Sequence, residues 1–181
     1  MLTKPECGWT YFQIDGEHEY IMGYLTDVAI DWLEQAIHGL KELSPFTVRG
    51  FSEPGRVLCT ASYWNCYVIE EEEHKMHKIW SFHDATLSMI DFCKRLYRDI
   101  SKDIDAWVMW DTSSMENLYC VHECRRENCD GVTDCPLDND VDDYMQPVID
   151  WRKGCIQEKL DELKRLIDEN EEHFGPNRCF F

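Results

Sequence analysis

The alternation of apolar and polar residues over residues 46–82 constrains the fold of this chain more than any other feature. The segments FTVRGF, RVLCTASY and CYVIEEE each have a period of two, which is typical of strands with one buried face. Turn-forming residues at 53–55 and a bend at 64–65 separate these segments, and HKIWSF at 77–82 suits a further strand. We therefore predict an antiparallel β-meander.

A β-hairpin and a helix are predicted ahead of this meander. Residues 9–14 and 18–25 are rich in aromatic and β-branched types, and the turn dipeptide Asp15-Gly16 separates them. The following segment repeats apolar residues at steps of three and four, and Thr26 or Asp27 supplies a side-chain cap at its start. The proline after Ser44 ends this helix.

Two further helices are predicted after the meander. One is capped by Asp84 and ends near residue 102, and the other occupies residues 147–173 and starts at Pro147. Residues 105–145 lack a regular period, so we interpret them as a long excursion of the chain. We expect residues 1–181 to form one α+β domain: an antiparallel β-meander sheet packed by two to three helices, with the cysteine-containing excursion before the C-terminal helix.

The excursion contains the candidate metal ligands of the sequence. Cys120, Cys124, Cys129 and Cys135 lie within it, and His122 lies inside the first pair. Zinc takes four thiolate or imidazole ligands, and a spacing of about two to four residues lets one turn present two of them. The first pair fits, whereas the later spacings are longer than those of a zinc ribbon. Three alternatives stay open: a structural zinc ion on the four thiolates with His122 as a substitute, a disulfide in the oxidised protein, or unligated thiols.

The net charge of the chain limits its partners. The sequence has 36 acidic and 18 basic residues, so its formal charge is -18. This charge repels phosphates, and we expect no direct binding to nucleic acid. No apolar run approaches the roughly twenty residues of a membrane span, and the N-terminal segment lacks the pattern of a signal peptide. We expect a cytoplasmic protein, with no membrane contact, whose surface favours a basic protein partner.

The sequence contains no catalytic signature. Neither a Gly-x-Ser-x-Gly elbow, nor a phosphate-binding glycine loop, nor a His-Glu-x-x-His motif occurs. This favours a non-enzymatic binding module, like an immunity protein or an inhibitor. The alternatives are a module whose structural zinc mediates assembly, and an enzyme with a dispersed Cys/His site. Trp107 and Trp110, at the start of the excursion, are candidate anchors for a partner.

Part of the chain resembles an uncharacterised group of small acidic bacterial α+β proteins. In that group, a strand ending in a Tyr-Leu-Thr/Ser-Asp sequence leads into a helix, as residues 24–27 do here. A Phe-x-x-Glu-Pro-Gly turn leads into its meander, which Phe51 and the turn residues at 53–55 match in part. The resemblance covers about residues 9–105 and implies the same architecture, with a likeness to immunity proteins in size and charge only. It supplies no catalytic residue.

Overall fold

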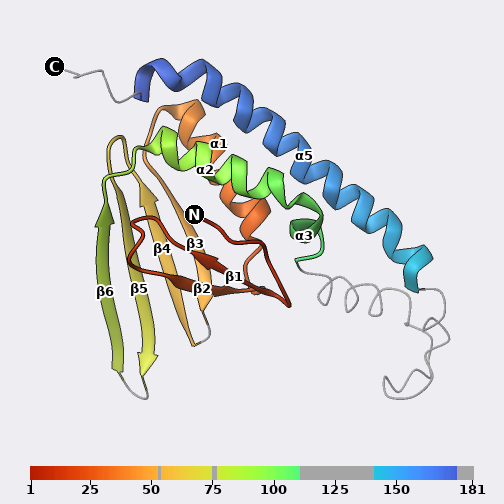
Figure 1. Ribbon diagram of the computed structural model, residues 1–181, viewed down its shortest axis with the longest axis horizontal. Coiled ribbons are helices and arrows are strands. Elements are labelled where there is room, and N and C mark those ends of the chain that lie inside the picture. Colours follow the sequence, from red (N-terminus) through yellow and green to blue (C-terminus); the bar gives the residue numbers. More distant parts are fainter. Residues whose placement is uncertain (53, 75–76, 111–140, 175–181) are drawn as a thin grey trace.

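The sheet of the protein is an antiparallel meander, as predicted. A computed structural model describes residues 1–52, 54–74, 77–110 and 141–174 of the chain (Figure 1). In this part of the chain, six strands follow one another across the sheet in sequence order. They are β1 (Trp9–Phe12), β2 (Tyr20–Gly23), β3 (Phe46–Ser52), β4 (Gly55–Ala61), β5 (Cys66–His74) and β6 (His77–Ala85).

The helices lie on one face of this sheet. Those that the structure describes are α1 (Val28–Glu42), α2 (Met89–Lys102), α3 (Ile104–Val108) and α5 (Val141–Phe174). Helices α1 and α2 lie next to the sheet, and the long helix α5 packs across α1, α2 and α3 from the outside (Figure 1). The other face of the sheet carries no helix of the described residues. The α+β class predicted from the sequence is confirmed.

The start of α2 differs from the prediction. Strand β6 continues to Ala85, so Asp84 belongs to the strand and does not cap the helix. Ser88 is the cap: its hydroxyl accepts the N–H of Asp91 at 3.1 Å and donates to the carboxylate of Asp91 at 2.6 Å. A serine followed three residues later by an acid is a capping-box signal, and it outweighs the isolated Asp84.

The last helix also starts earlier than predicted. Helix α5 begins at Val141, and Pro147 lies inside it. A proline within a helix removes one backbone hydrogen bond and crowds the preceding turn, and a helix of 34 residues tolerates this local cost. The predicted excursion is also shorter at its start, because α3 occupies residues 104–108.

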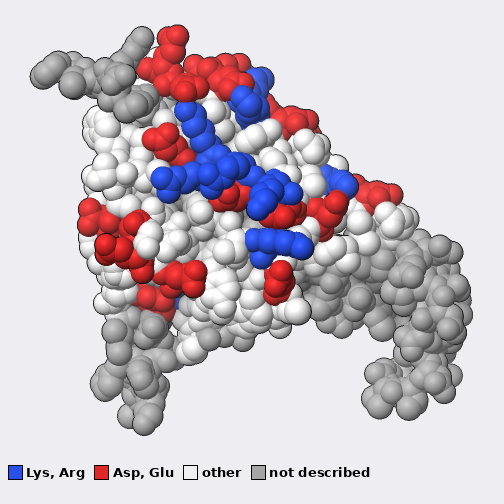
Figure 2. Space-filling model, viewed as in Figure 1, with Lys and Arg blue, Asp and Glu red and all other residues white. Residues whose placement is uncertain are grey.

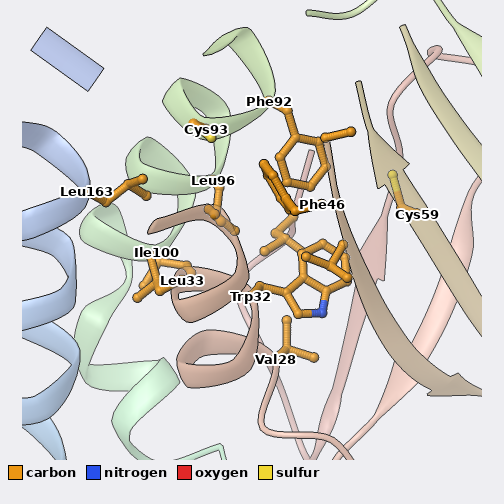
Figure 3. Packing of buried hydrophobic residues seen from close by; sticks show 14 of the residues in the cluster. Val28, Trp32, Leu33, Phe46, Cys59, Phe92, Cys93, Leu96, Ile100 and Leu163 are labelled. Carbon is orange, nitrogen blue, oxygen red and sulfur yellow. The ribbon is translucent and has the colours of Figure 1, made fainter. Parts of the chain in front are cut away.

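Trp32 of α1 lies at the centre of the core (Figure 3). Its ring meets Phe12 edge-on with centroids 5.1 Å apart and stacks on Phe92 of α2 at 6.2 Å. The indole N–H donates to the carbonyl of Arg49 at 2.7 Å. Strand β2 pairs with β3 only between Gly23 and Phe51, so it supplies no donor to the carbonyl of Arg49 on β3. The indole N–H of Trp32 satisfies this carbonyl instead.

Candidate functional site

The face of the sheet opposite the helices exposes neighbouring apolar side chains. Leu58 on β4, Ile69 on β5 and Phe82 on β6 are direct cross-strand partners. Tyr67 stacks on Phe82 with a centroid distance of 6.1 Å, and Trp80 lies two residues from Phe82 on the same face of β6. Phe82 is 61% exposed and Trp80 is 51% exposed. We name Leu58, Tyr67, Ile69, Trp80 and Phe82 the outer-face patch.

An ion pair borders this patch. Arg56, Glu71 and Trp80 form the adjacent cross-strand row on β4, β5 and β6. The Nε atom of Arg56 donates to Glu71 at 2.5 Å, and the guanidinium carbon lies 6.0 Å from the centre of the Trp80 ring. The Glu71 side chain is only 6% exposed, so its charge is covered by Arg56. Within this row the charges of Arg56 and Glu71 therefore balance each other, although the chain as a whole is strongly acidic.

The outer-face patch is suited to binding another macromolecule. Single exposed apolar residues are normal on a protein surface, whereas contiguous apolar patches often mark interaction sites. Large aromatic side chains such as Trp80 and Phe82 commonly dominate the energy of such contacts. Four of the five patch residues are hydrocarbon or indole side chains, and the phenol of Tyr67 is the one ionisable group of the five, so the patch chiefly offers apolar area for docking.

The tryptophans that the sequence indicated as partner anchors are in the core. Trp107 is fully buried, and Trp110 is 4% exposed with its indole N–H donating to the carbonyl of Thr26 at 2.8 Å. That interpretation was wrong, because α3 places the Trp107 ring in the core, and the turn after α3 places the Trp110 ring against Thr26. The exposed aromatic residues of the sheet, Trp80 and Phe82, were not singled out, although they occupy alternate positions of the predicted strand at 77–82.

A hollow adjoins the patch between α1 and β3. It has a volume of about 300 Å³, and its lining includes Asp31, Gln35, Arg49 and Leu58. Leu58 belongs to both features, so the hollow is continuous with the outer-face patch. Burial raises the pKa of Asp31, and the neighbouring carboxylates of Asp27 and Glu34 raise it further. The positive charges of Arg49 and Arg152 act in the opposite direction and lower this pKa, so the hollow combines hydrogen-bonding groups of both charges.

A cluster of polar side chains joins the β1–β2 turn to β6 on the helical side of the sheet. Asp15 accepts the backbone N–H groups of Glu17 and His18, each at 2.9 Å, and His18 Nδ1 lies 2.5 Å from its carboxylate. Desolvation alone would raise the pKa of Asp15, but the hydrogen bonds from His18 and Glu17 outweigh it and hold this pKa well below its usual value. The His18 ring stacks on His83 of β6 with centroids 3.7 Å apart.

Tyr20 completes this cluster without adding an accessible group. Its side chain is 2% exposed, and its hydroxyl has no hydrogen-bond partner among the described residues. Burial raises the pKa of Tyr20 well above its usual value, and the charges of Asp15 and Glu70 add to this effect. An imidazole held by a carboxylate can accept a proton, but a phenol this deeply buried cannot reach a substrate. The cluster therefore serves to hold the turn against β6.

Three thiols are buried between the sheet and the helices. They belong to Cys59 on β4, Cys66 on β5 and Cys93 on α2. Burial raises the pKa of Cys59 and of Cys93 well above the usual value, and the adjacent Cys66 thiol raises that of Cys59 further. Because the thiolate is the reactive form of cysteine, the thiols of Cys59 and Cys93 are unreactive at neutral pH. All three buried cysteines pack as small apolar side chains.

The predicted metal ligands Cys120, Cys124, Cys129, Cys135 and His122 lie outside the described residues. Among the residues that the structure does describe, no group of three or more His, Cys, Asp or Glu side chains is arranged to hold a metal ion. The predicted zinc site therefore stays a prediction.

Comparison with known proteins identifies no relative: no family model, curated protein or solved structure matches the chain. None of the helices within the described ranges combines the length and the apolar composition that a membrane span requires. The fold is that of an α+β protein whose sheet has helices on one face and, within the described residues, no helix on the other.

Proposed function

We propose that the protein is a non-enzymatic binding module, comparable in role to an immunity or inhibitor protein, that takes a basic protein partner on its open sheet face. The observation that carries this proposal is the outer-face patch, where Trp80 and Phe82 are more than half exposed. A partner that covered these rings would remove a large apolar area from water, and each Å² of buried apolar surface contributes about 25 cal/mol to the free energy of binding.

The hollow beside the patch supports the basic character of the partner. Burial, and after it the charges of Asp27 and Glu34, raise the pKa of Asp31, so a lysine or arginine side chain that entered the hollow would stabilise the ionised Asp31 carboxylate. Arg49, which also lines the hollow, leaves room for one such charge. The apolar stem of such a side chain would lie against Leu58, which lines both the hollow and the patch. A partner segment with aromatic or aliphatic residues beside one basic residue fits this surface.

The helical face is less suited to a charged partner. Figure 2 shows Lys and Arg side chains gathered over α2 and acidic side chains along α5. Many of these charges are paired within the protein, because Lys94 binds Glu171 at 2.7 Å and Lys153 binds Asp105 at 2.6 Å. Internal pairing of this kind stabilises the helix packing and leaves less free charge for a partner.

Affinity capture with matched variants tests the proposal. Proteins retained by the immobilised wild-type chain are compared with those retained by Trp80→Ala, Asp31→Asn and Trp151→Ala. Trp151 is the control, because it is 66% exposed on α5, far in sequence from the patch. A protein that the wild type and Trp151→Ala retain, and that Trp80→Ala releases, is then purified and its dissociation constant measured.

We expect this protein to be basic and its affinity for Trp80→Ala to fall at least tenfold, which corresponds to about 1.4 kcal/mol. The Asp31→Asn change should weaken binding less and reduce its dependence on salt concentration. If the wild type and Trp80→Ala retain the same proteins with the same affinity, the open sheet face is not the binding surface and the proposal fails.

A further inference from the structure

Strand β6 forms an open edge of the sheet. Among the described strands it pairs with β5 alone, and no element lies beside it on its outer side (Figure 1). At the β4–β5 turn the N–H of Ser62 donates to the carbonyl of Asn65 at 2.9 Å, which fixes the alternation of bonded pairs along β4 and β5. Carried through the β5–β6 register, this alternation directs the backbone groups of Ser81 and His83 toward β5. Because bonding alternates along an antiparallel strand, Trp80, Phe82 and Asp84 direct their backbone N–H and C=O groups toward the open side.

This edge lacks most of the features that usually prevent strand pairing. Proteins protect edge strands by keeping them short or by adding prolines, bulges or inward-pointing charges. Strand β6 has nine residues and no proline, and its pairing with β5 runs without a bulge from Cys66 opposite Ala85 to His74 opposite His77. Such an edge is a template for another strand.

The sequence of β6 is complementary to itself when two copies run antiparallel with Ser81 on the two-fold axis. In this register the residue numbers of two opposed positions add to 162. Trp80 of each copy therefore lies opposite Phe82 of the other, which gives two equivalent aromatic pairs. Lys78 comes opposite Asp84 in the same way, which places opposite charges at both ends. In this register the backbone groups that point away from β5 in one copy lie opposite the same groups of the other copy and can hydrogen-bond to them. This follows because Lys78, Trp80, Phe82 and Asp84 all alternate with Ser81 along the strand.

Charge favours this edge over other contacts between two copies. The chain carries a formal charge of -18, so most approaches of one copy to another are repulsive. Strand β6 contains one lysine and one aspartate and no other Asp, Glu, Lys or Arg, so it is formally neutral with neutral histidines. Aromatic pairs and pairs of opposite charge across strands each contribute about 0.2–1 kcal/mol.

We propose that β6 binds β6 of a second copy of this chain, so that two six-stranded sheets join into one sheet of a two-fold symmetric dimer. The joined sheet brings Trp80 and Phe82 of both copies side by side on its open face. This proposal goes beyond the proposed function and is independent of it, because the open face stays free in the dimer.

Directed cross-linking tests both the dimer and its register. Ser81→Cys places two thiols directly opposite each other at the axis, where paired Cβ atoms are about 4.5–5.5 Å apart. Asp84→Cys is the matched control on the same strand, since its two copies would be six residues out of register and about 20 Å apart. Both variants keep the same native cysteines. Mild oxidation should give a covalent dimer of Ser81→Cys that Asp84→Cys does not form.

The mass in solution provides the second measurement. We expect the wild type to sediment at about 43 kDa, twice the chain mass of 21.5 kDa. Phe82→Pro removes an outward N–H without removing a bond to β5, and should sediment as a monomer with the circular dichroism of the wild type. A wild-type monomer, equal cross-linking of the two cysteine variants, or a folded Phe82→Pro dimer would each overturn the proposal. A monomer that still bound a basic partner through Trp80 would leave the proposed function standing.

Discussion

Arg152 of α5 and Asp27 at the start of α1 form a bidentate ion pair, although they lie 125 residues apart in the sequence. Arg152 Nη2 donates to Asp27 Oδ1 at 2.9 Å, Nη1 donates to Oδ2, and Nε donates to the carbonyl of Val108 at 3.0 Å. The same Asp27 carboxylate accepts the N–H of Ile30 at 3.2 Å and so caps α1. One buried guanidinium therefore ties α5 to the start of α1 and to the end of α3.

Replacing Arg152 should destabilise the protein strongly. The Arg152 side chain is 6% exposed, so Arg152→Met leaves the Asp27 carboxylate and two backbone carbonyls without their donor. We expect a loss of about 3 kcal/mol in the free energy of unfolding, measured by urea denaturation. Arg165→Met, on the exposed face of α5, should have a much smaller effect, because water screens its ion pairs. Equal effects of the two changes would contradict the role given to Arg152.

The sequence indicated half of this ion pair. Thr26 or Asp27 was predicted as the helix cap, because a cap depends on residues two or three positions away, and Asp27 is the cap. Arg152 could not be distinguished from the other charged residues of a helix of alternating charge, because its partner is remote in the sequence. Local signals therefore predict caps and turns, and they do not predict which charged residue of α5 is turned into the core.

Two glycine-to-alanine changes in helices should have opposite effects. A Cβ atom at Gly39 of α1 would lie 2.2 Å from Cδ1 of Phe46, which is 5% exposed and packs edge-on against Phe92. Gly39→Ala should therefore destabilise the protein by about 1–3 kcal/mol. A Cβ atom at Gly154 of α5 meets no atom within 4 Å, so Gly154→Ala should stabilise it by about 0.5–1 kcal/mol.

Thermal and urea unfolding of both glycine variants measure these effects. The two changes add the same methyl group to a helix and differ in their surroundings. A Gly39→Ala variant as stable as the wild type, or more stable, would show that the contact between Gly39 and Phe46 does not restrict the packing of α1.

The hydrogen bonds of Asp15 should make stability depend on acid pH. Because the pKa of Asp15 is lower in the folded chain than in the unfolded one, its ionised form contributes stability above about pH 4. This contribution is lost as the pH falls below that value toward the folded pKa. Asp15→Asn should therefore lose less stability than the wild type between pH 5 and pH 3.

Urea unfolding at a series of pH values measures this difference, with the exposed Asp161→Asn as the control. Comparison with Asp161→Asn separates the loss of one surface carboxylate from the loss of the hydrogen bonds that Asp15 accepts in the turn. If Asp15→Asn and the wild type have parallel pH profiles, the turn at Asp15 contributes nothing to acid stability.

Removing the buried hydroxyl of Tyr20 should stabilise the protein. This hydroxyl is buried without a described partner, so Tyr20→Phe removes a desolvated polar atom and should gain about 1 kcal/mol at neutral pH. The raised pKa of Tyr20 means that the wild type loses stability as the pH rises above about 10, the usual value of the unfolded chain. Tyr20→Phe should lack that part of the alkaline loss.

Calorimetric unfolding at pH 7 and at pH 10.5 measures both parts of this prediction. The exposed Tyr11→Phe serves as the control, because its ring is 42% exposed on β1 and its hydroxyl reaches water. A destabilised Tyr20→Phe would indicate that the hydroxyl has a favourable interaction in the folded protein.

The outer-face patch shows where the sequence pattern stops being informative. Alternation in β6 separates Trp80 and Phe82 from Ser81 and His83, and apolar character alone would turn the aromatic pair inward. The pairing with β5 decides otherwise: His83 lies opposite Val68, which is fully buried, so His83 and Ser81 share the helical side. The period identified the strand, whereas the register, which depends on the neighbouring strand, determined which residues were left in water.

Helix α5 has a consequence for the order in which the chain folds during its synthesis. It packs on α1, α2 and α3, whose residues leave the ribosome long before it does. Leu163 of α5 lies beside Cys93 and Leu96 of α2 (Figure 3). Until α5 emerges, this apolar surface of the nascent chain is exposed to water and prone to aggregation. The meander and the first helices therefore cannot complete their core until α5 has been synthesised. A nascent chain stalled before α5 would depend on chaperones to remain soluble.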